Sequence, residues 1–126
     1  MAGNDSALSC FLDWLDERII FLRHLEKEAA EVARREGNSD RYRQLMLQKA
    51  LFLEAMGEEA EEPLAGVPAA VSEIARARFA CFGKSARQAM DLDSLFYMAC
   101  LLYPEDHKPG QPNDLEALYS ELKAKA

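Results

Sequence analysis

The chain has few of the residues that build disulfide frameworks. It contains 126 residues, of which three are cysteines. Cys10, Cys81 and Cys100 form an odd, widely spaced set, which is typical of reduced thiols in a cytoplasmic protein. All three fall in apolar helical stretches, so the sequence predicts small buried hydrophobic side chains rather than reactive thiols.

Motifs for catalysis and for cofactor or metal binding are also missing. The two histidines are His24 and His107, and a carboxylate-bridged di-iron bundle needs a Glu three residues before a His on each of two helices. Phe21 and Pro104 occupy those positions. The tripeptide 83–85, Gly-Lys-Ser, lacks the earlier glycine and the preceding strand of a phosphate-binding loop. We therefore predict no catalytic residue, no cofactor and no metal site.

Long apolar runs are absent as well. The longest, LFYMACLLY at 95–103, is far shorter than the roughly 18 apolar residues of a membrane span and predicts a buried core helix. The first residues lack the basic and apolar regions of a secretion signal. The formal charge of −7 argues against a general affinity for nucleic acid or anionic membranes. The expected location is cytoplasmic, and the Ala- and Leu-rich style suggests a bacterial protein.

What the chain does have is helical periodicity, with apolar residues recurring at three and four positions. We expect an all-α fold, a compact bundle of about five helices in one domain spanning 1–126. Residues 1–5 are expected to fray, and 104–113 to form a Pro-rich loop. The predicted helices are 7–35, 40–57, 68–88, 93–103 and 114–124.

The helix ends are predicted from capping residues and breakers. Asp5 or Ser6 is expected to cap the first helix, Ser39 or Asp40 the second, and Asp91 or Asp93 the fourth. Gly37 and Asn38 would form the first turn, and Gly57 either stops the second helix or lets it continue to Glu62. Gly83 marks an end or a kink of the third helix. Asn113 and Glu116 have the spacing of a capping box.

Glu26 and Lys49 are the most informative residues. Each lies at the centre of an apolar stripe, and their midpoint falls in the turn near Gly37. An antiparallel hairpin of the first two helices therefore brings the two charges face to face. The first interpretation is an ion pair that fixes the register of the hairpin. The alternatives are that the pair reaches solvent at the edge of the seam, or that it lines a cavity that binds a polar molecule.

Two further groups are candidates for interaction or for a pocket. Leu47 and Leu51 form a second apolar side of the second helix, which is either covered by later helices or offered to a partner. Phe79, Phe82, Phe96 and Tyr97, with Tyr103, are candidates to line a pocket, with Arg78 or Lys49 supplying charge. Arg78 either pairs with one of the glutamates at 58–62 or binds an anion in that pocket.

Residues 13–56 resemble the helical hairpin of bacterial flagellar export chaperones of the FlgN type. The resemblance lies in a Leu- and Glu-rich first helix containing Glu26, a turn with Gly37 followed by Asp40, and Lys49 near leucines in the second helix. It covers about a third of the chain, and the Pro-punctuated second half departs from it. The resemblance implies binding of a helical client by an amphipathic segment near 93–103 or 114–124.

These observations favour a non-enzymatic protein-interaction module: an adaptor, a subunit or a client-specific chaperone. Its partner would be another protein or a second copy of the chain as a homodimer. The arginines near the hairpin tip and the glutamates at 54–62 place opposite charges at its two ends, which would steer such association. The alternative is a small-ligand-binding or regulatory helical bundle with a pocket near Arg78.

Overall fold

The computed structural model describes residues 2–35 and 39–125, with only the backbone described for 2–5. Within these residues no strand is present, and the predicted all-α fold is confirmed. The helices are α1 (Ala2–Ala33), α2 (Ser39–Glu59), α3 (Glu61–Leu64), α4 (Ala69–Asp91), α5 (Leu95–Cys100) and α6 (Asp114–Ala124). No described helix is long and apolar enough to cross a membrane.

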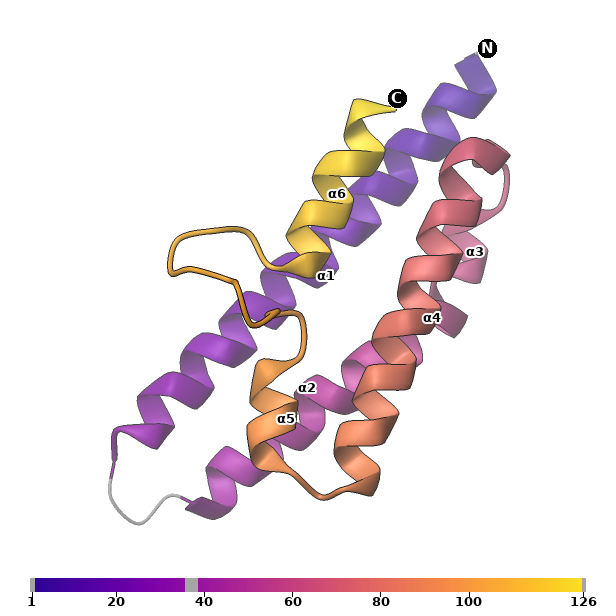
Figure 1. Ribbon diagram of the computed structural model, residues 1–126. Helices are drawn as coiled ribbons and strands as arrows, with labels where there is room; N and C mark the ends of the chain where they lie inside the picture. Colours follow the sequence, from indigo (N-terminus) through magenta and orange to yellow (C-terminus); the bar gives the residue numbers. More distant parts are fainter. Residues whose placement is uncertain (1, 36–38, 126) are drawn as a thin grey trace.

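The first two helices run antiparallel along the length of the molecule (Figure 1). Two sequence expectations about α1 were wrong. Residues 2–5 are helical rather than frayed, and Asp5 and Ser6 therefore lie inside α1 and not at its N-cap. The helix ends at Ala33, before the arginines of the tip. The predicted stop at Gly37 and the turn at Asn38 lie outside the described residues.

Helix α2 extends past Gly57, which was the earlier of its two predicted ends. Ser39 and Asp40 are its first two residues, so neither is the N-cap, and the cap position falls outside the described residues. Gly57 does not end the helix, which continues to Glu59. The short α3 follows directly and contains Pro63. Proline is tolerated there because the first turn of a helix needs no intrahelical N–H donor.

Helix α4 runs without interruption through Gly83 to Asp91, so this glycine does not end the helix. A β-carbon added at Gly83 would lie 3.5 Å from the backbone oxygen of Glu54 on α2, which is an ordinary van der Waals distance. The two helices therefore pack closely at this point.

Helix α5 is shorter than the predicted 93–103. Its N-cap is Ser94, whose hydroxyl accepts a hydrogen bond from the Tyr97 N–H (3.1 Å), and not Asp91 or Asp93. The helix ends at Cys100 because the chain turns there: Leu102 has a left-handed φ of 74°, and both Leu101 and Leu102 are buried. Helix α6 matches its predicted range, and the Asn113–Glu116 capping box is present.

The core lies where α4 and α6 cover the hairpin. In Figure 1, α6 lies beside α1 and α4 lies along α2, with the loop before α6 on the same face as α5. The aromatic centre of the core is Phe79, whose ring lies 6.4 Å from that of Phe11 and 6.2 Å from that of Trp14. The core thus joins the first helix of the chain to the fourth.

Replacing Phe79 with alanine tests this packing. We expect Phe79→Ala to lower the free energy of unfolding by about 3–5 kcal/mol, because it leaves a large cavity among side chains that are fully buried. Phe96→Ala is the matched control, since Phe96 is 72% exposed, and its effect should stay within about 0.5 kcal/mol. Urea unfolding followed by circular dichroism measures both. Equal losses for the two variants would contradict the assignment of Phe79 to the core.

Candidate functional site

The structure brings Glu26 and Lys49 together. The Lys49 Nζ lies 3.1 Å from Oε2 of Glu26, with the lysine side chain 1% and the glutamate side chain 16% exposed. Each comes from the middle of its helix, at the mirrored positions that the sequence gives for an antiparallel hairpin. Burial lowers the pKa of Lys49, and the neighbouring Glu26 carboxylate opposes that shift.

Residues after α4 complete the environment of this pair. The Lys49 ammonium also donates to the carbonyl oxygen of Ala99 on α5 (3.0 Å) and lies 5.2 Å from the centre of the Tyr103 ring. The Tyr103 hydroxyl donates to Oε1 of Glu26 (2.8 Å). Burial, helped by this hydrogen bond, raises the pKa of Tyr103 to about 12. A buried ammonium thus has an anion, a carbonyl and an aromatic face as partners.

Arg23 extends the network to α6. Its Nη1 donates to the Tyr103 hydroxyl (2.9 Å), and its Nε donates to Glu116 (3.0 Å), which Nη2 also contacts. Glu116 in turn accepts from the backbone N–H of Asn113 (2.8 Å) in the capping box. Although burial opposes it, these hydrogen bonds lower the pKa of Glu116. One connected network therefore joins α1, α2, α5 and α6.

The arrangement is a cluster around Glu26 with shifted pKa values, which is a pattern that also occurs in catalytic sites. Glu26, Lys49 and Tyr103 also line a groove, together with alanines of α1 and with Tyr42 and Met46 of α2. However, the ammonium of Lys49 is enclosed and already has its hydrogen-bond acceptors. The geometry therefore favours a structural role, fixing helices relative to one another, over proton transfer to a bound molecule.

The aromatic pocket expected around Arg78 does not form as predicted. Phe79 is buried in the core and Phe82 packs partly against it, whereas Phe96 is 72% exposed. Arg78 forms its ion pair with Glu121 of α6 (2.9 Å) and not with any of the glutamates at 58–62. The expectation failed because α4 directs Phe79 towards Phe11 and Trp14 of α1, whereas Phe96 and Tyr97 of α5 are exposed.

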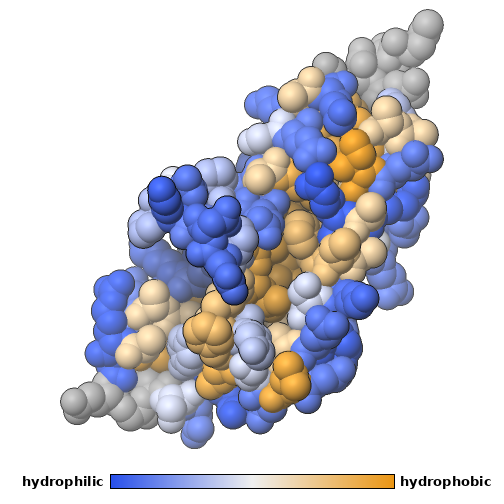
Figure 2. Space-filling view, viewed as in Figure 1, coloured by the Kyte–Doolittle hydropathy of each residue, from blue (hydrophilic) through white to orange (hydrophobic). Residues whose placement is uncertain are grey.

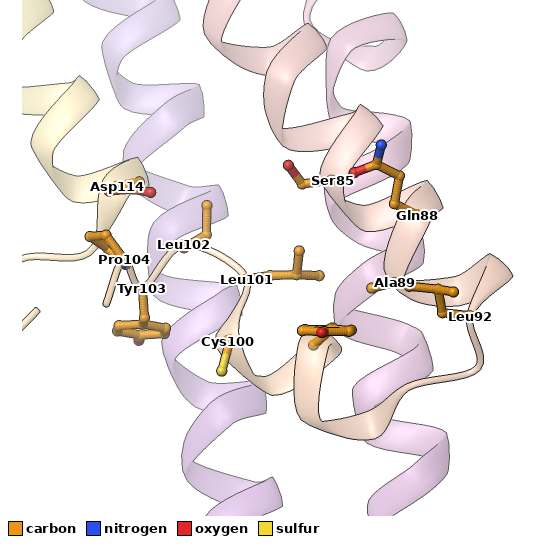
Figure 3. Close-up of a pocket in the computed structure, with 11 residues that line it drawn as sticks. Ser85, Gln88, Ala89, Leu92, Cys100, Leu101, Leu102, Tyr103, Pro104 and Asp114 are labelled. Atoms are coloured by element: carbon orange, nitrogen blue, oxygen red, sulfur yellow. The ribbon is translucent and has the colours of Figure 1, made fainter. Parts of the chain in front are cut away.

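A different pocket lies between α4 and the segment 101–114 (Figure 3). Ser85, Gln88 and Leu92 line it from α4, and Asp114 and Pro104 line it from the opposite side. Of the residues that the sequence predicted to line a pocket, Tyr97 and Tyr103 belong to it. Sequence reasoning missed Asp114 because its position depends on the reversal of the chain at Leu102.

The second apolar side of α2 is not covered by later helices. Leu51 is 53% exposed, and Leu47 is half-buried beside it. On α1, Ile20 is 50% and Phe21 42% exposed, and the ring of Phe21 stacks on that of Phe52 at 4.9 Å. We define Phe21, Leu47, Leu51 and Phe52, which line one groove, as the hairpin face. Ile20 lies outside it, in a different groove with Arg23 and Glu116.

Several tip arginines have acidic partners within the chain. Arg41 pairs with Glu28, and Arg43 pairs with Asp93 (2.6 Å). At the other end, Glu54 and Glu61 pair with arginines of α4. The charge separation expected along the hairpin is therefore partly neutralised.

The cysteine prediction was wrong. Cys10, Cys81 and Cys100 are all exposed, because each lies on the outer side of its helix. Within the described residues, no group of three or more His, Cys, Asp or Glu side chains is placed to hold a metal ion.

Comparisons with protein families, with curated proteins and with solved structures gave no match to this chain. The interpretation of its surfaces therefore rests on their geometry and chemistry.

Removing one charge of the pair tests its burial. We expect Glu26→Leu alone to lower the free energy of unfolding by about 3–5 kcal/mol, because it leaves the Lys49 ammonium buried without an anion. Lys49→Leu alone should cost less, because Glu26 keeps Arg23 (3.8 Å) and the Tyr103 hydroxyl as partners. The double variant should lose much less than Glu26→Leu, since no orphaned charge remains. Urea unfolding of the four proteins measures the coupling energy. Equal small losses for all three variants would contradict a buried pair.

The raised pKa of Tyr103 predicts a pH dependence. The neutral phenol is favoured in the folded state, so its contribution to stability is complete below pH 10, the unfolded value, and is lost as the pH rises towards 12. The free energy of unfolding should therefore fall more steeply between pH 10 and 12 in the native chain than in Tyr103→Phe. The lowered pKa of Lys49 acts in the opposite direction but is common to both proteins. Parallel pH profiles would contradict the assignment.

Proposed function

We propose that the chain is a non-enzymatic helical protein-interaction module that binds its partner through the hairpin face. The single observation that carries this proposal is the exposure of large apolar side chains from two adjacent helices. Leu51 of α2 is 53% and Phe21 of α1 is 42% exposed, and the ring of Phe21 stacks on that of Phe52 across the two helices. Contiguous exposed apolar groups of this kind are typical of protein-binding surfaces.

The shape and composition of the face favour a helical partner. Leu47 and Leu51 are one turn apart on α2, and Phe21 lies across the seam on α1. The polar groups around them, Gln44 and Gln48, are uncharged. Such a face suits the apolar side of an amphipathic helix, which would pack against the hairpin as a further helix of the bundle. If the chain is an adaptor, the partner is the protein that it recruits. If it is a subunit or a chaperone, the partner is another subunit of the same complex or the client protein.

The resemblance to FlgN-type export chaperones implies client binding by 93–103 or 114–124. Of these two segments, α6 directs Leu115, Leu118 and Leu122 into the core, where they are fully buried. In contrast, α5 leaves Phe96 and Tyr97 exposed. If a client is bound in the manner of that family, the structure favours α5 as the contributing segment, in addition to the hairpin face.

A charge placed on the hairpin face tests the proposal. We expect Leu51→Glu to abolish capture of a stoichiometric partner from native host lysate, because the charge would be desolvated in the complex. Since Leu51 is 53% exposed, the fold should be unaffected, and circular dichroism checks this. Leu92→Glu is the matched control, because Leu92 is an apolar residue that is 66% exposed and lines a different pocket, and this variant should retain the partner.

Sedimentation analysis of the purified chain distinguishes the two kinds of partner. A dimer that dissociates in Leu51→Glu would identify the partner as a second copy of the chain. A monomer that captures one other protein would identify an adaptor or chaperone. A monomer that captures nothing, or a partner retained by Leu51→Glu, would contradict the proposal.

A further inference from the structure

The pocket between α4 and the segment 101–114 has the properties of a small-ligand site. Its volume is about 440 Å³, within the usual range for such sites. In Figure 3, Leu101 and Leu102 lie between Asp114 on one side and Ser85 and Gln88 of α4 on the other. Figure 2 shows apolar surface in a hollow in the middle of this face, bordered by hydrophilic side chains. The pocket is therefore a concave apolar surface with a few polar groups.

The position of Asp114 is set by the backbone. Leu102 has a φ of 74°, an uncommon conformation for a residue with a side chain, and its burial in the core holds it there. The carbonyl oxygen of Leu102 accepts the N–H of Asp114 at 3.0 Å. The turn therefore fixes the start of α6 beside the two leucines, with the Asp114 side chain at the pocket wall.

The Asp114 carboxylate lacks a cationic partner among residues 2–35 and 39–125, where none of the ion pairs involves it. Burial raises the pKa of Asp114, while the neighbouring His107 and Arg78 oppose this shift and Asp106 reinforces it. Arg78 is already neutralised by Glu121 at 2.9 Å. The carboxylate is thus partly removed from water without a partner that replaces the lost hydration.

The pocket wall at Asp114 is a poor binding site for an anion, although it lies at the start of α6. The N–H of Asp114 already has Leu102 as its acceptor, and the N–H of Glu116 is bonded to the Asn113 side chain (2.8 Å). Few donors of the first turn remain, and Asp114 would repel a second negative charge. A cation with N–H donors would instead satisfy the carboxylate.

We propose that this pocket binds a small amine, whose protonated nitrogen pairs with the Asp114 carboxylate and whose apolar part packs on Leu101, Leu102 and Leu92. Leu92 is 66% exposed at the mouth of the pocket, where a ligand would cover it. Ser85 and Gln88 supply further hydrogen-bonding groups on the α4 wall. This site is separate from the hairpin face, so the inference does not depend on the proposed function.

The test is a titration of the ¹⁵N-labelled full chain at pH 7.5, followed by NMR. The probes are 2-phenylethylamine and 2-phenylethanol, which share the apolar part and differ in the charged nitrogen. The amine should shift the amide signals of residues 85–92, 101–103 and 114 with a dissociation constant at least tenfold lower than that of the alcohol. Similar affinities for the two probes, or shifts located elsewhere, would overturn the proposal.

Two substitutions assign the parts of the site. Asp114→Asn keeps the size of the side chain and should reduce amine affinity to that of the alcohol, whereas Asp106→Asn, the control on the same segment, should leave it within twofold. Leu92→Ser changes an exposed side chain and should weaken both probes several-fold. Unchanged amine affinity in Asp114→Asn would overturn the role of the carboxylate. Unchanged affinities in Leu92→Ser would overturn the placement of the apolar part.

Discussion

The buried ammonium of Lys49 is the constraint on which the rest of the structure depends. A lysine that is 1% exposed is costly unless its charge and its N–H groups have partners. Its partners come from three places in the chain: Glu26 on α1, the Ala99 carbonyl on α5 and the Tyr103 ring. The hairpin alone supplies only one of them. The second half of the chain must therefore be in place for Lys49 to be fully satisfied.

This dependence links features that are far apart in the sequence. Tyr103 contacts Glu26 and Arg23, and Arg23 contacts Glu116 at the start of α6. The same segment that carries Tyr103 turns at Leu102 and positions Asp114 at the pocket wall. The packing of the segment 101–114 therefore gives rise to both the polar network and the pocket. The hairpin face lies outside this arrangement, which leaves it available to a partner.

The sequence predicted those features that depend on local periodicity and spacing. The mirrored positions of Glu26 and Lys49 and the spacing of Asn113 and Glu116 both correspond to contacts in the structure. The predictions that failed concern features that depend on how a helix is rotated about its axis and on where the chain reverses its direction. The apolar stretch 95–103 was expected to form a buried helix, yet Phe96 is 72% and Tyr97 52% exposed, and α5 ends at Cys100. Arg23 escaped notice, and Tyr103 was predicted only as a residue that lines a pocket, because their contact joins residues 80 positions apart.

The most direct test of the central claim is hydrogen exchange of Glu26→Gln compared with the native chain. The substitution keeps the size of the side chain but removes the charge opposite Lys49. If the network anchors the second half to the hairpin, backbone amides of α5 and α6 will exchange faster, while those of α4 around Phe79 keep their protection. Equal acceleration in every helix, or no change in α5 and α6, would contradict this account.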